Sequence, residues 1–398
     1  MKTAFLNGDL SEEIYLMPPQ PHPEDKVWRL RKGIYGLKQA GRVWYKRLDT
    51  ALLSLGFTRS QADPCLYIHG NTLLAVYVDD IIIAADDIDI NPLKQKLMNL
   101  FNMTDLGPVK WVLGVNIISS PDRTSFLLSQ RAYIESILSM YNMLNCRGVT
   151  APLETRLGPA TPEEQDEFTQ LNISFAQAVG KLAYLAQVTR PDLAYTLSAL
   201  ARYQSSPGIQ HWRAFKHVLR YLSSTRNLSL IIKPSDLSLT SFADSDWAGD
   251  DTRRSTSGNI CQLGGATITW SSVLQRTVAL STAEAEYVSV ANAAKQVLWI
   301  QQLLSDIGIN QTKTPLYCDN QAALALTKNP IKHQKTKHMD IQYHFVRELQ
   351  ASGTISVAYC PTTSMPADIM TKPLSPKKNQ QCLELLQIGD MSTHGRVL

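Results

Sequence analysis

Two adjacent aspartates interrupt an otherwise apolar stretch of the chain. Asp79 and Asp80 lie within "LLAVYVDDIIIAADD" (73–87), between two runs rich in β-branched residues. One interpretation is a plain β-hairpin in which polar residues form the turn. The other is a metal site, in which a rigid hairpin presents two carboxylates to a cation. The local pattern leaves both interpretations open.

Four further acids stand near the ends of elements expected in the C-terminal third. Each follows or opens a predicted strand or helix, and they are Asp244, Glu286, Asp319 and Asp368. Strand ends and adjoining helix starts converge on one edge of a sheet. Converging carboxylates repel one another unless cations neutralise them, and oxygen ligands suit Mg²⁺ or Mn²⁺. The pattern predicts a metal site, although any one of these acids alone is more simply a surface charge.

Local chemistry separates these acids from their neighbours. "STAE" (281–284) fits a capping box, in which Glu284 returns to the amide of the N-cap residue Ser281. Glu286 has no such structural role, so it is assigned to the site. In "FADSD", Asp246 shares a strand face with Asp244 and is either a secondary ligand or a turn residue.

Composition places the chain among ordinary globular proteins. Its 398 residues allow two or three domains, and 44% are hydrophobic and 19% charged. The formal net charge of +4 is too small to indicate nucleic-acid binding by itself. Six cysteines without a CxxC pair argue against a zinc site or a disulfide framework and favour free thiols. No apolar run reaches the roughly 18 residues of a membrane span, and no signal peptide is recognisable.

Hydrophobic periodicity divides the chain into four regions. Helices at 42–57 and 90–101 alternate with strands in the first, and three helices follow a Pro- and Glu-rich linker at 153–170. From Leu239 the order is βββαβαβα with one extra helix, a mixed sheet flanked by helices. The predicted regions are 1–152, 153–234, 235–375 and a C-terminal tail at 376–398.

The third helix of the central block is basic on one side. Arg213, Lys216 and Arg220 are interleaved with aromatic residues in "HWRAFKHVLRYL". Such a helix presents either a solvated face or a surface for a phosphate backbone.

Several motifs together resemble one known family. "SDWAGD", "RRSTSG", "LSTAEAEY", "YCDNQAAL", "KTKHMDIQYHFVRE" and "ADIMTKPL" resemble the ribonuclease H domain of copia-type retrotransposon Pol polyproteins. "KTAFLNGDL", "GIYGLKQAGRVWY", "YVDD" and "FNMTDLG" resemble the reverse transcriptase of the same family, and "AVGKLAYL" and "RPDLAY" its connecting region. The implied fold is α/β, with an α+β palm followed by a ribonuclease H-like mixed sheet.

The resemblance assigns roles to both groups of acids. It places the ribonuclease H acids at Asp244, Glu286, Asp319 and Asp368, and implies two-metal hydrolysis with ions roughly 4 Å apart. Many such enzymes carry a histidine shortly before the last acid, and "YCPTTSMPAD" has none, so no general-acid histidine is assigned. The resemblance also places Asp79 and Asp80 in a metal-binding polymerase hairpin, which favours the metal interpretation of the opening motif.

An RNA–DNA hybrid is the implied partner, with Mg²⁺ or Mn²⁺ as cofactor. In the palm, "LKQAGR" would lie near nucleotide and template, with Lys38, Gln39 and Arg42 as contacts. Further phosphate contacts are expected from a group of basic residues, Arg213, Lys216, Arg220, Lys335, Lys337 and Arg347. No membrane association is expected, and the expected location is cytoplasmic, in a virus-like particle if a full element is present, or nuclear.

The polymerase half lacks one expected ligand. In the family a third carboxylate stands two residues before the Lys of "KTAFLNG", which here is Lys2, so it would precede the chain. We therefore expect no DNA synthesis by this chain alone and expect the surviving activity to be cleavage of RNA in RNA–DNA hybrids. The alternative is a non-catalytic remnant that binds nucleic acid.

Overall fold

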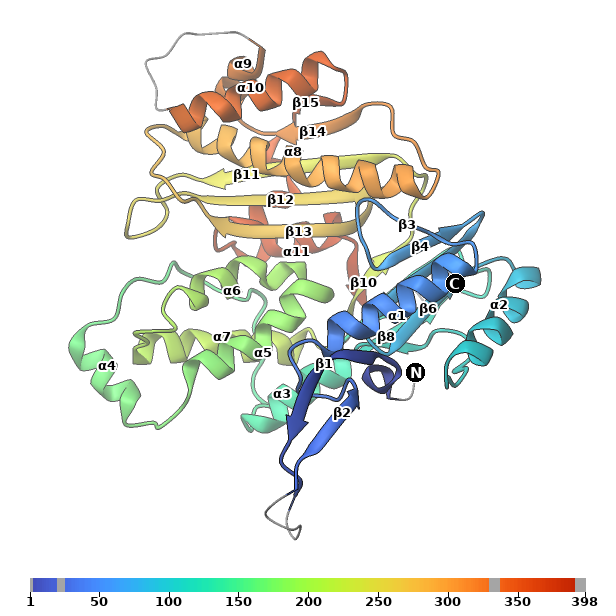
Figure 1. The fold of residues 1–398 in the computed structure, drawn as a ribbon. Coiled ribbons are helices and arrows are strands. Elements are labelled where there is room, and N and C mark those ends of the chain that lie inside the picture. The colour runs from blue at the N-terminus through green and yellow to red at the C-terminus, as the bar shows by residue number, and fades with distance from the viewer. Residues whose placement is uncertain (1–2, 20–25, 329–336, 391–398) are drawn as a thin grey trace. The chain divides into compact units, whose positions relative to one another are not determined.

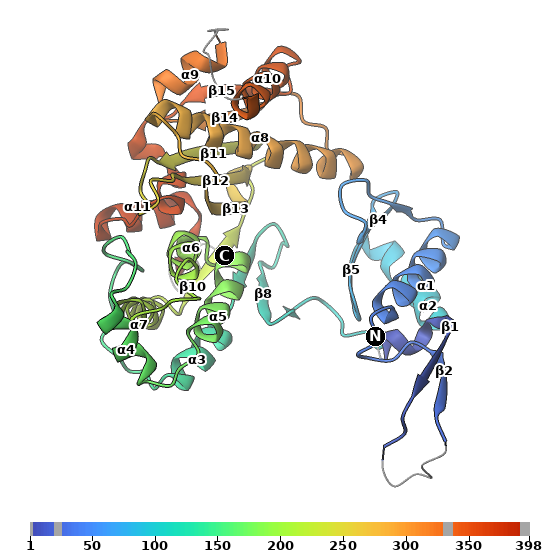
Figure 2. The ribbon, with the colours of Figure 1, turned by 60° about the vertical axis from the view of Figure 1, so that its left-hand side comes forward.

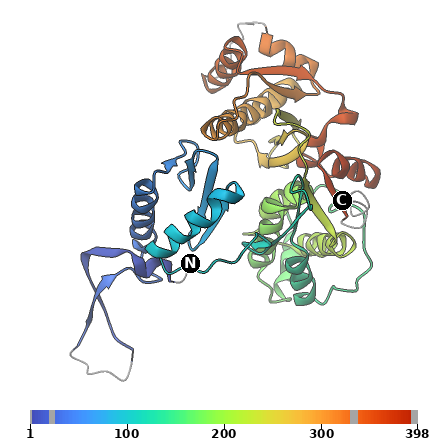
Figure 3. The same ribbon diagram turned by 90° about the vertical axis from the view of Figure 1, so that its right-hand side faces the viewer.

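The computed structural model describes residues 3–19, 26–328 and 337–390, and the chain forms two compact units. The first contains residues 3–109 and 302–310, and the second contains 110–301 together with the chain from 311 onward. Residues 3–109 are drawn in blue to cyan in Figure 3. Of the helices in the described part of the chain, none has the length and apolar character needed to cross a membrane.

The first unit is built on a four-stranded antiparallel sheet with strand order β3-β4-β5-β6. Its strands are β3 (Thr58–Arg59), β4 (Leu66–His69), β5 (Thr72–Tyr77) and β6 (Asp80–Ala84). Helices α1 (Ala40–Ser54) and α2 (Asp87–Leu100) pack on this sheet, and Leu48 and Leu97 meet Leu74 in one core. A hairpin of β1 (Asp9–Leu16) and β2 (Trp28–Lys32) lies beside α1 (Figure 2).

The helix predicted at 90–101 begins earlier than expected. Helix α2 starts at Asp87, which places Pro92 inside the helix rather than in its first turn. Acidic residues Asp87 and Asp89 in the first turn stabilise the positive end of the helix dipole, which explains the earlier start.

The second unit joins a helical block to two five-stranded sheets. The first sheet has strand order β16-β10-β9-β8-β7. Its members are β7 (Trp111–Val112), β8 (Val115–Ser119), β9 (Phe126–Ser129), β10 (Leu228–Ile232) and β16 (Ile388–Asp390). The helical block contains α3 (Arg131–Met140), α4 (Pro162–Thr169), α5 (Phe175–Val188), α6 (Ala194–Ala201) and α7 (Ile209–Ser224), which share one large apolar core.

The second sheet confirms the mixed α/β fold. Its strand order is β13-β12-β11-β14-β15, antiparallel among β11–β13 and parallel from β11 through β14 to β15. The strands are β11 (Leu239–Asp246), β12 (Thr256–Leu263), β13 (Ala266–Leu274), β14 (Thr314–Cys318) and β15 (Ile355–Tyr359). Helix α8 (Thr282–Asp306) crosses one face and α11 (Pro376–Leu385) lies on the other, while α9 (Gln321–Lys328) and α10 (Lys337–Ala351) follow β14 (Figure 1).

Two segments are more ordered than the sequence indicated. In the predicted linker 153–170, Thr161 and Glu164 form a capping box for α4, and Phe168 is buried against the helical core. "TPEE" is itself an N-terminal signal, but the eight-residue helix is too short to show periodicity. In the predicted tail, α11 is capped by the preceding Ser375, and β16 pairs with β10.

A buried histidine gives the helical block a pH-dependent stability. His211 Nδ1 accepts from the amide of Gly208 at 2.9 Å, so its proton resides on Nε2, which lies 2.9 Å from the carbonyl oxygen of Gly158. Burial lowers the pKa of His211 below its ordinary value of 6.5. The folded chain therefore binds fewer protons than the unfolded chain in acid, and this contribution to stability is complete above 6.5 and declines as pH falls.

We therefore expect His211→Gln to flatten the acid side of the stability profile. Unfolding free energy measured by urea titration between about pH 5 and 8 should fall less steeply toward acid in the variant. At neutral pH the variant should be less stable by about 1 kcal/mol because one hydrogen bond is lost. An unchanged slope would show that His211 does not govern the acid response.

Candidate functional site

Asp244 lies at the carboxyl end of β11 and is 2% exposed. The hydroxyl of Thr371 donates a hydrogen bond to its Oδ2. The ammonium of Lys372 lies 3.7 Å from the same oxygen. Burial raises the pKa of Asp244 to about 6, even though Lys372 acts in the opposite direction. Its carboxylate is therefore short of positive charge.

Glu286 projects from the second turn of α8 and is 5% exposed. The hydroxyl of Ser289, almost one turn later, donates to the backbone oxygen of Asp244 at 2.7 Å and fixes the helix to β11. The amide of Ser245 donates to Glu286 Oε1 at 3.2 Å. Burial, followed by the charges of Asp244 and Asp319, raises the pKa of Glu286 to about 9.

Glu284 has the structural role that the sequence predicted. The amide of Glu284 donates to Ser281 Oγ at 3.2 Å, and Glu284 Oε2 accepts from the amide of Leu280 at 2.9 Å. The carboxylate reaches one residue further than expected, and it caps the start of α8. The two glutamates thus serve different purposes on one helix.

Asp319 follows β14 immediately and precedes α9. Asn320 caps that helix through a 3.0 Å bond from the amide of Ala323, so the chain turns sharply at the strand end. The hydroxyl of Thr362 donates to Asp319 Oδ2 at 2.9 Å. Ligand atoms of Glu286, Cys318 and Asp319 all lie within 4.8 Å of one another.

Asp368 lies in a short 3₁₀ segment, Pro366–Met370, and is 1% exposed. Two lysines contact its carboxylate, Lys372 Nζ at 2.6 Å from Oδ1 and Lys378 Nζ at 3.1 Å from Oδ2. Lys378 also donates to the carbonyl oxygen of Thr362, the residue whose hydroxyl bonds Asp319. Asp368 is therefore joined to Asp244 through Lys372 and to Asp319 through Lys378 and Thr362.

The residues of this cluster fit a divalent cation. Four carboxylates meet there, and their oxygen atoms are the ligands that Mg²⁺ and Mn²⁺ prefer. Burial raises the pKa of Asp244 and of Glu286, and a bound cation would favour their charged forms. Glu286 and Asp319 form one group with the softer sulfur of Cys318. Lys372 joins Asp244 to Asp368, and the amide of Ser245, the residue after Asp244, donates to Glu286.

Asp246 is held by the helical block. Arg156 Nη2 lies 2.6 Å from both carboxylate oxygens of Asp246, and Arg202 Nη1 lies 3.1 Å from Asp250 Oδ2. These two arginines, both outside the predicted domain 235–375, hold the loop 246–252 that follows Asp244. Asp246 is the last residue of β11, where it pairs with Thr256, and Arg156 is its own counter-ion.

We expect Arg156→Gln to loosen this loop. Because Arg156 is 49% exposed and Asp246 only 12%, the pair is expected to contribute about 1 kcal/mol, between typical exposed and buried pairs. Amide exchange of residues 246–252 should become roughly fivefold faster by mass spectrometry, since local opening governs exchange. Arg213→Gln, which removes an exposed ion pair to Glu167, is the control and should leave that loop unchanged.

The aspartates of the opening motif form a two-residue hairpin turn and its exit. Tyr77 pairs with Asp80, so Val78 and Asp79 make the turn, and Val78 has a φ of 51°. A β-branched residue in the left-handed region is strained, and such strain concentrates at functional sites. Trp44 Nε1 donates to the carbonyl of Val78 at 2.9 Å, and the hydroxyl of Tyr35 donates to Asp79 Oδ2 at 2.9 Å.

The hairpin carries fewer ligands than the four-acid cluster. Within residues 3–19, 26–328 and 337–390, no third His, Cys, Asp or Glu joins Asp79 and Asp80 in a group within 4.8 Å. Lys38 and Arg42 are exposed near the start of α1, and Gln39 donates to Glu12 Oε2 at 2.8 Å.

Three of the six other basic residues predicted to contact phosphate have internal partners. Arg213 pairs with Glu167 at 3.2 Å, Arg220 donates to the carbonyl of Arg147, and Arg347 donates to that of Leu326. Lys216 is exposed on α7, which packs against α3–α6. Lys335 lies outside the described residues, as does the side chain of Lys337.

Sequence reasoning missed the cations of the cluster. Lys372 stands four residues after Asp368, the spacing of an ion pair on one helical turn, and that signal was available in "ADIMTK". Lys378 had no such signal, because it lies on α11 in the segment predicted as a tail.

Comparison with known proteins shows to which family the chain is similar. Residues 1–155 match the family model described as reverse transcriptase (RNA-dependent DNA polymerase). The chain is 38% identical to the retrovirus-related Pol polyprotein from transposon TNT 1-94 of Nicotiana tabacum, across 97% of this chain and 30% of that protein. It is 34% identical to a putative transposon Ty5-1 protein of Saccharomyces cerevisiae, across 74% of this chain and 99% of that protein.

Among solved structures, the chain is similar to the foamy viral protease–reverse transcriptase in complex with an RNA/DNA hybrid. The TM-score is 0.49 and the identity 12%, over 91% of this chain and 46% of that one. The chain spans less than a third of the plant Pol polyproteins that it matches. On the strength of the sequence matches, the chain belongs to the copia-type retrotransposon Pol polyproteins, and its residues 1–155 belong to their reverse transcriptase.

Proposed function

We propose that this chain cuts the RNA strand of RNA–DNA hybrids by divalent metal-dependent hydrolysis. The observation that carries the proposal is the meeting of Asp244, Glu286, Asp319 and Asp368 in one compact unit. Acids that only solubilise the surface are not expected to cluster in a buried site, because their mutual repulsion there would destabilise the fold. A functional site retains such a cluster because it binds a cation.

The four acids would hold the metal ions. When bound, divalent ions supply a hydroxide from water and stabilise the leaving 3′-oxygen of the phosphodiester. The chain's own residues orient the ligands. Thr371 holds the Asp244 carboxylate, Thr362 holds that of Asp319, and the Ser245 amide holds that of Glu286.

Binding of the hybrid is proposed to use exposed basic side chains. Lys38, Arg42 and Lys216 are exposed and available for phosphates, so they are the strongest members of the predicted set. Such contacts release counter-ions, and the affinity should therefore fall steeply as salt increases. The two aspartates of the palm hairpin are proposed to derive from a polymerase site, and DNA synthesis by the residues described here is not proposed.

The proposed activity is tested by cleavage assays on three nucleic-acid substrates in Mg²⁺. We expect the purified chain in Mg²⁺ to cleave a labelled RNA–DNA hybrid and to leave single-stranded RNA and duplex DNA intact, with activity abolished by EDTA. Products should carry 5′-phosphate and 3′-hydroxyl ends, as attack by metal-activated water requires. Binding of hybrid without any cleavage in Mg²⁺ or Mn²⁺ would instead support the non-catalytic remnant.

A further inference from the structure

One lysine contacts two acids of the cluster. Lys372 Nζ lies 2.6 Å from Asp368 Oδ1 and 3.7 Å from Asp244 Oδ2, and its side chain is 33% exposed. Both carboxylates are almost fully buried. The ammonium thus lies between two ligands proposed for a divalent ion.

The charge of Lys372 is maintained by its surroundings. The ammonium lies within ion-pair distance of both carboxylates, which favour its positive charge. Removing one partner of such a buried pair leaves an uncompensated charge, which is strongly destabilising. The acids and the lysine therefore depend on one another when no other cation is present.

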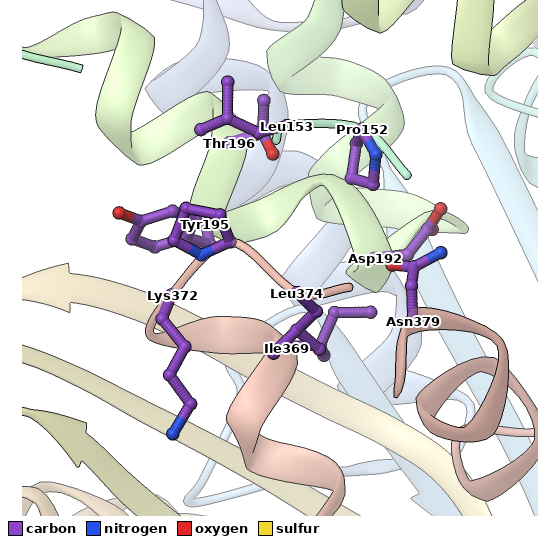
Figure 4. Close-up of a pocket in the computed structure, with 10 residues that line it drawn as sticks. Pro152, Leu153, Asp192, Tyr195, Thr196, Ile369, Lys372, Leu374 and Asn379 are labelled. Carbon is purple, nitrogen blue, oxygen red and sulfur yellow. The ribbon is translucent and has the colours of Figure 1, made fainter. Parts of the chain in front are cut away.

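Lys372 follows a residue that is bonded to Asp244, and it lines a small pocket on its other side. Thr371 bonds Asp244 directly, and the pocket behind the segment is lined by Asp192, Tyr195 and Asn379 among others (Figure 4). In that view the Lys372 ammonium points away from Asp192 and Asn379. The ammonium instead contacts the carboxylates of Asp368 and Asp244.

We propose that Lys372 is a built-in counter-ion that keeps Asp244 and Asp368 together in the metal-free site and competes with a divalent ion for them. The inference rests on the proposed function, since it assumes that these acids bind metal. Lys372 is a positioning residue: it acts through the carboxylates. Lys378, which contacts Asp368, supports the same acid from the opposite oxygen.

Two quantities should move in opposite directions when the charge is removed. In Lys372→Gln, the melting temperature in EDTA should fall, because the two carboxylates lose their cation. Mn²⁺ affinity, measured by electron paramagnetic resonance of free Mn²⁺, should rise by about three- to tenfold because a competitor is gone. A merely structural lysine would lower both stability and affinity, so unchanged or weaker Mn²⁺ binding overturns the proposal.

Matched variants isolate the role of charge. Lys372→Arg retains the charge and should keep the wild-type melting temperature and Mn²⁺ affinity to within about twofold. Lys377→Gln alters an exposed neighbour of Lys378 and should change neither quantity. If Lys372→Gln is unfolded in EDTA, added Mn²⁺ is expected to restore the fold, and a chain that stays unfolded at saturating Mn²⁺ contradicts the proposal.

Failure of the inference is distinguishable from failure of the proposed function. Wild-type Mn²⁺ binding that Asp319→Asn does not weaken would show that the acids are not the metal site, which overturns both. Binding that Asp319→Asn weakens but Lys372→Gln leaves unchanged would overturn only the role of Lys372.

Discussion

Glu286→Gln is expected to reduce hybrid cleavage by about 10²-fold or more while it raises the melting temperature of the metal-free protein. The loss is of the size seen when one charge-stabilising group is removed from an active site. The stability gain follows from burial, which raises the pKa of Glu286 to about 9 from an ordinary 4.5. Between these values the folded carboxyl retains a proton that the unfolded chain has released, so stability falls as pH rises.

The pH dependence checks the sign of this effect. Thermal unfolding in EDTA should show the variant above wild type near pH 8, with a smaller difference near pH 5, where both states of the wild type approach full protonation. Each kcal/mol should shift the melting temperature by roughly 2–4 °C for a domain of this size. Glu284→Gln is the control on the same helix, and it should retain cleavage. A Glu286→Gln protein that is less stable yet fully active would contradict the assignment.

Arg190→Met is expected to lower the unfolding free energy by roughly 3–5 kcal/mol, because it leaves a buried carboxylate without its partner. Arg190 is fully buried, and its Nη2 lies 2.7 Å from Asp192 Oδ2. The hydroxyl of Tyr221 donates to the same oxygen at 2.7 Å. Asn379, next to Lys378 on α11, also bonds within this network, so the pair supports the segment that carries the lysines of the site.

A control variant and a double variant test whether the loss of stability in Arg190→Met comes from the unpaired carboxylate of Asp192. Arg213→Met removes an exposed ion pair and should change the unfolding free energy by less than about 1 kcal/mol. The double variant Arg190→Met with Asp192→Leu should recover much of the loss, since removing both charges eliminates the unpaired carboxylate. Urea titration measures all three, and a loss below 1 kcal/mol in the single variant would show that Asp192 is compensated by other groups.

The regular elements from residue 239 onward could be predicted from the sequence. The predicted order βββαβαβα with one extra helix is observed from β11 to β15, and its last helical element is the 3₁₀ segment Pro366–Met370. These predictions succeed because strand alternation and helical periodicity are local signals. The separation of Glu284 from Glu286 also succeeded, because a capping box is defined by neighbouring residues.

The basic side chains that pair with the acids of the site could not be predicted from local sequence patterns. Lys378 reaches Asp368 from α11, and Arg156 reaches Asp246 across ninety residues of sequence. Such pairings depend on how the helical block and the sheet pack, which no local pattern encodes. The same limit applies to the basic helix α7. Arg213 and Arg220 bond to other residues of the protein, which the composition of the helix did not indicate.

The motif "YVDD" was explained only by its context. Alternation predicted the hairpin, and the observed turn at Val78 and Asp79 confirms it. The strained Val78 and the bond from Tyr35 to Asp79 are features of the folded unit that the letters alone do not reveal. The metal interpretation of Asp79 and Asp80 stays a prediction.

The most direct test of the four-acid site is the rate of hybrid cleavage in Mg²⁺ by wild type and by Asp319→Asn. Asn retains the shape and accepts the bond from Thr362, so the fold should be preserved. Asp236→Asn, an exposed acid of the same unit, serves as control. The site described here predicts a loss of about 10²-fold or more for Asp319→Asn and none for the control. Equal rates for wild type and Asp319→Asn would contradict it.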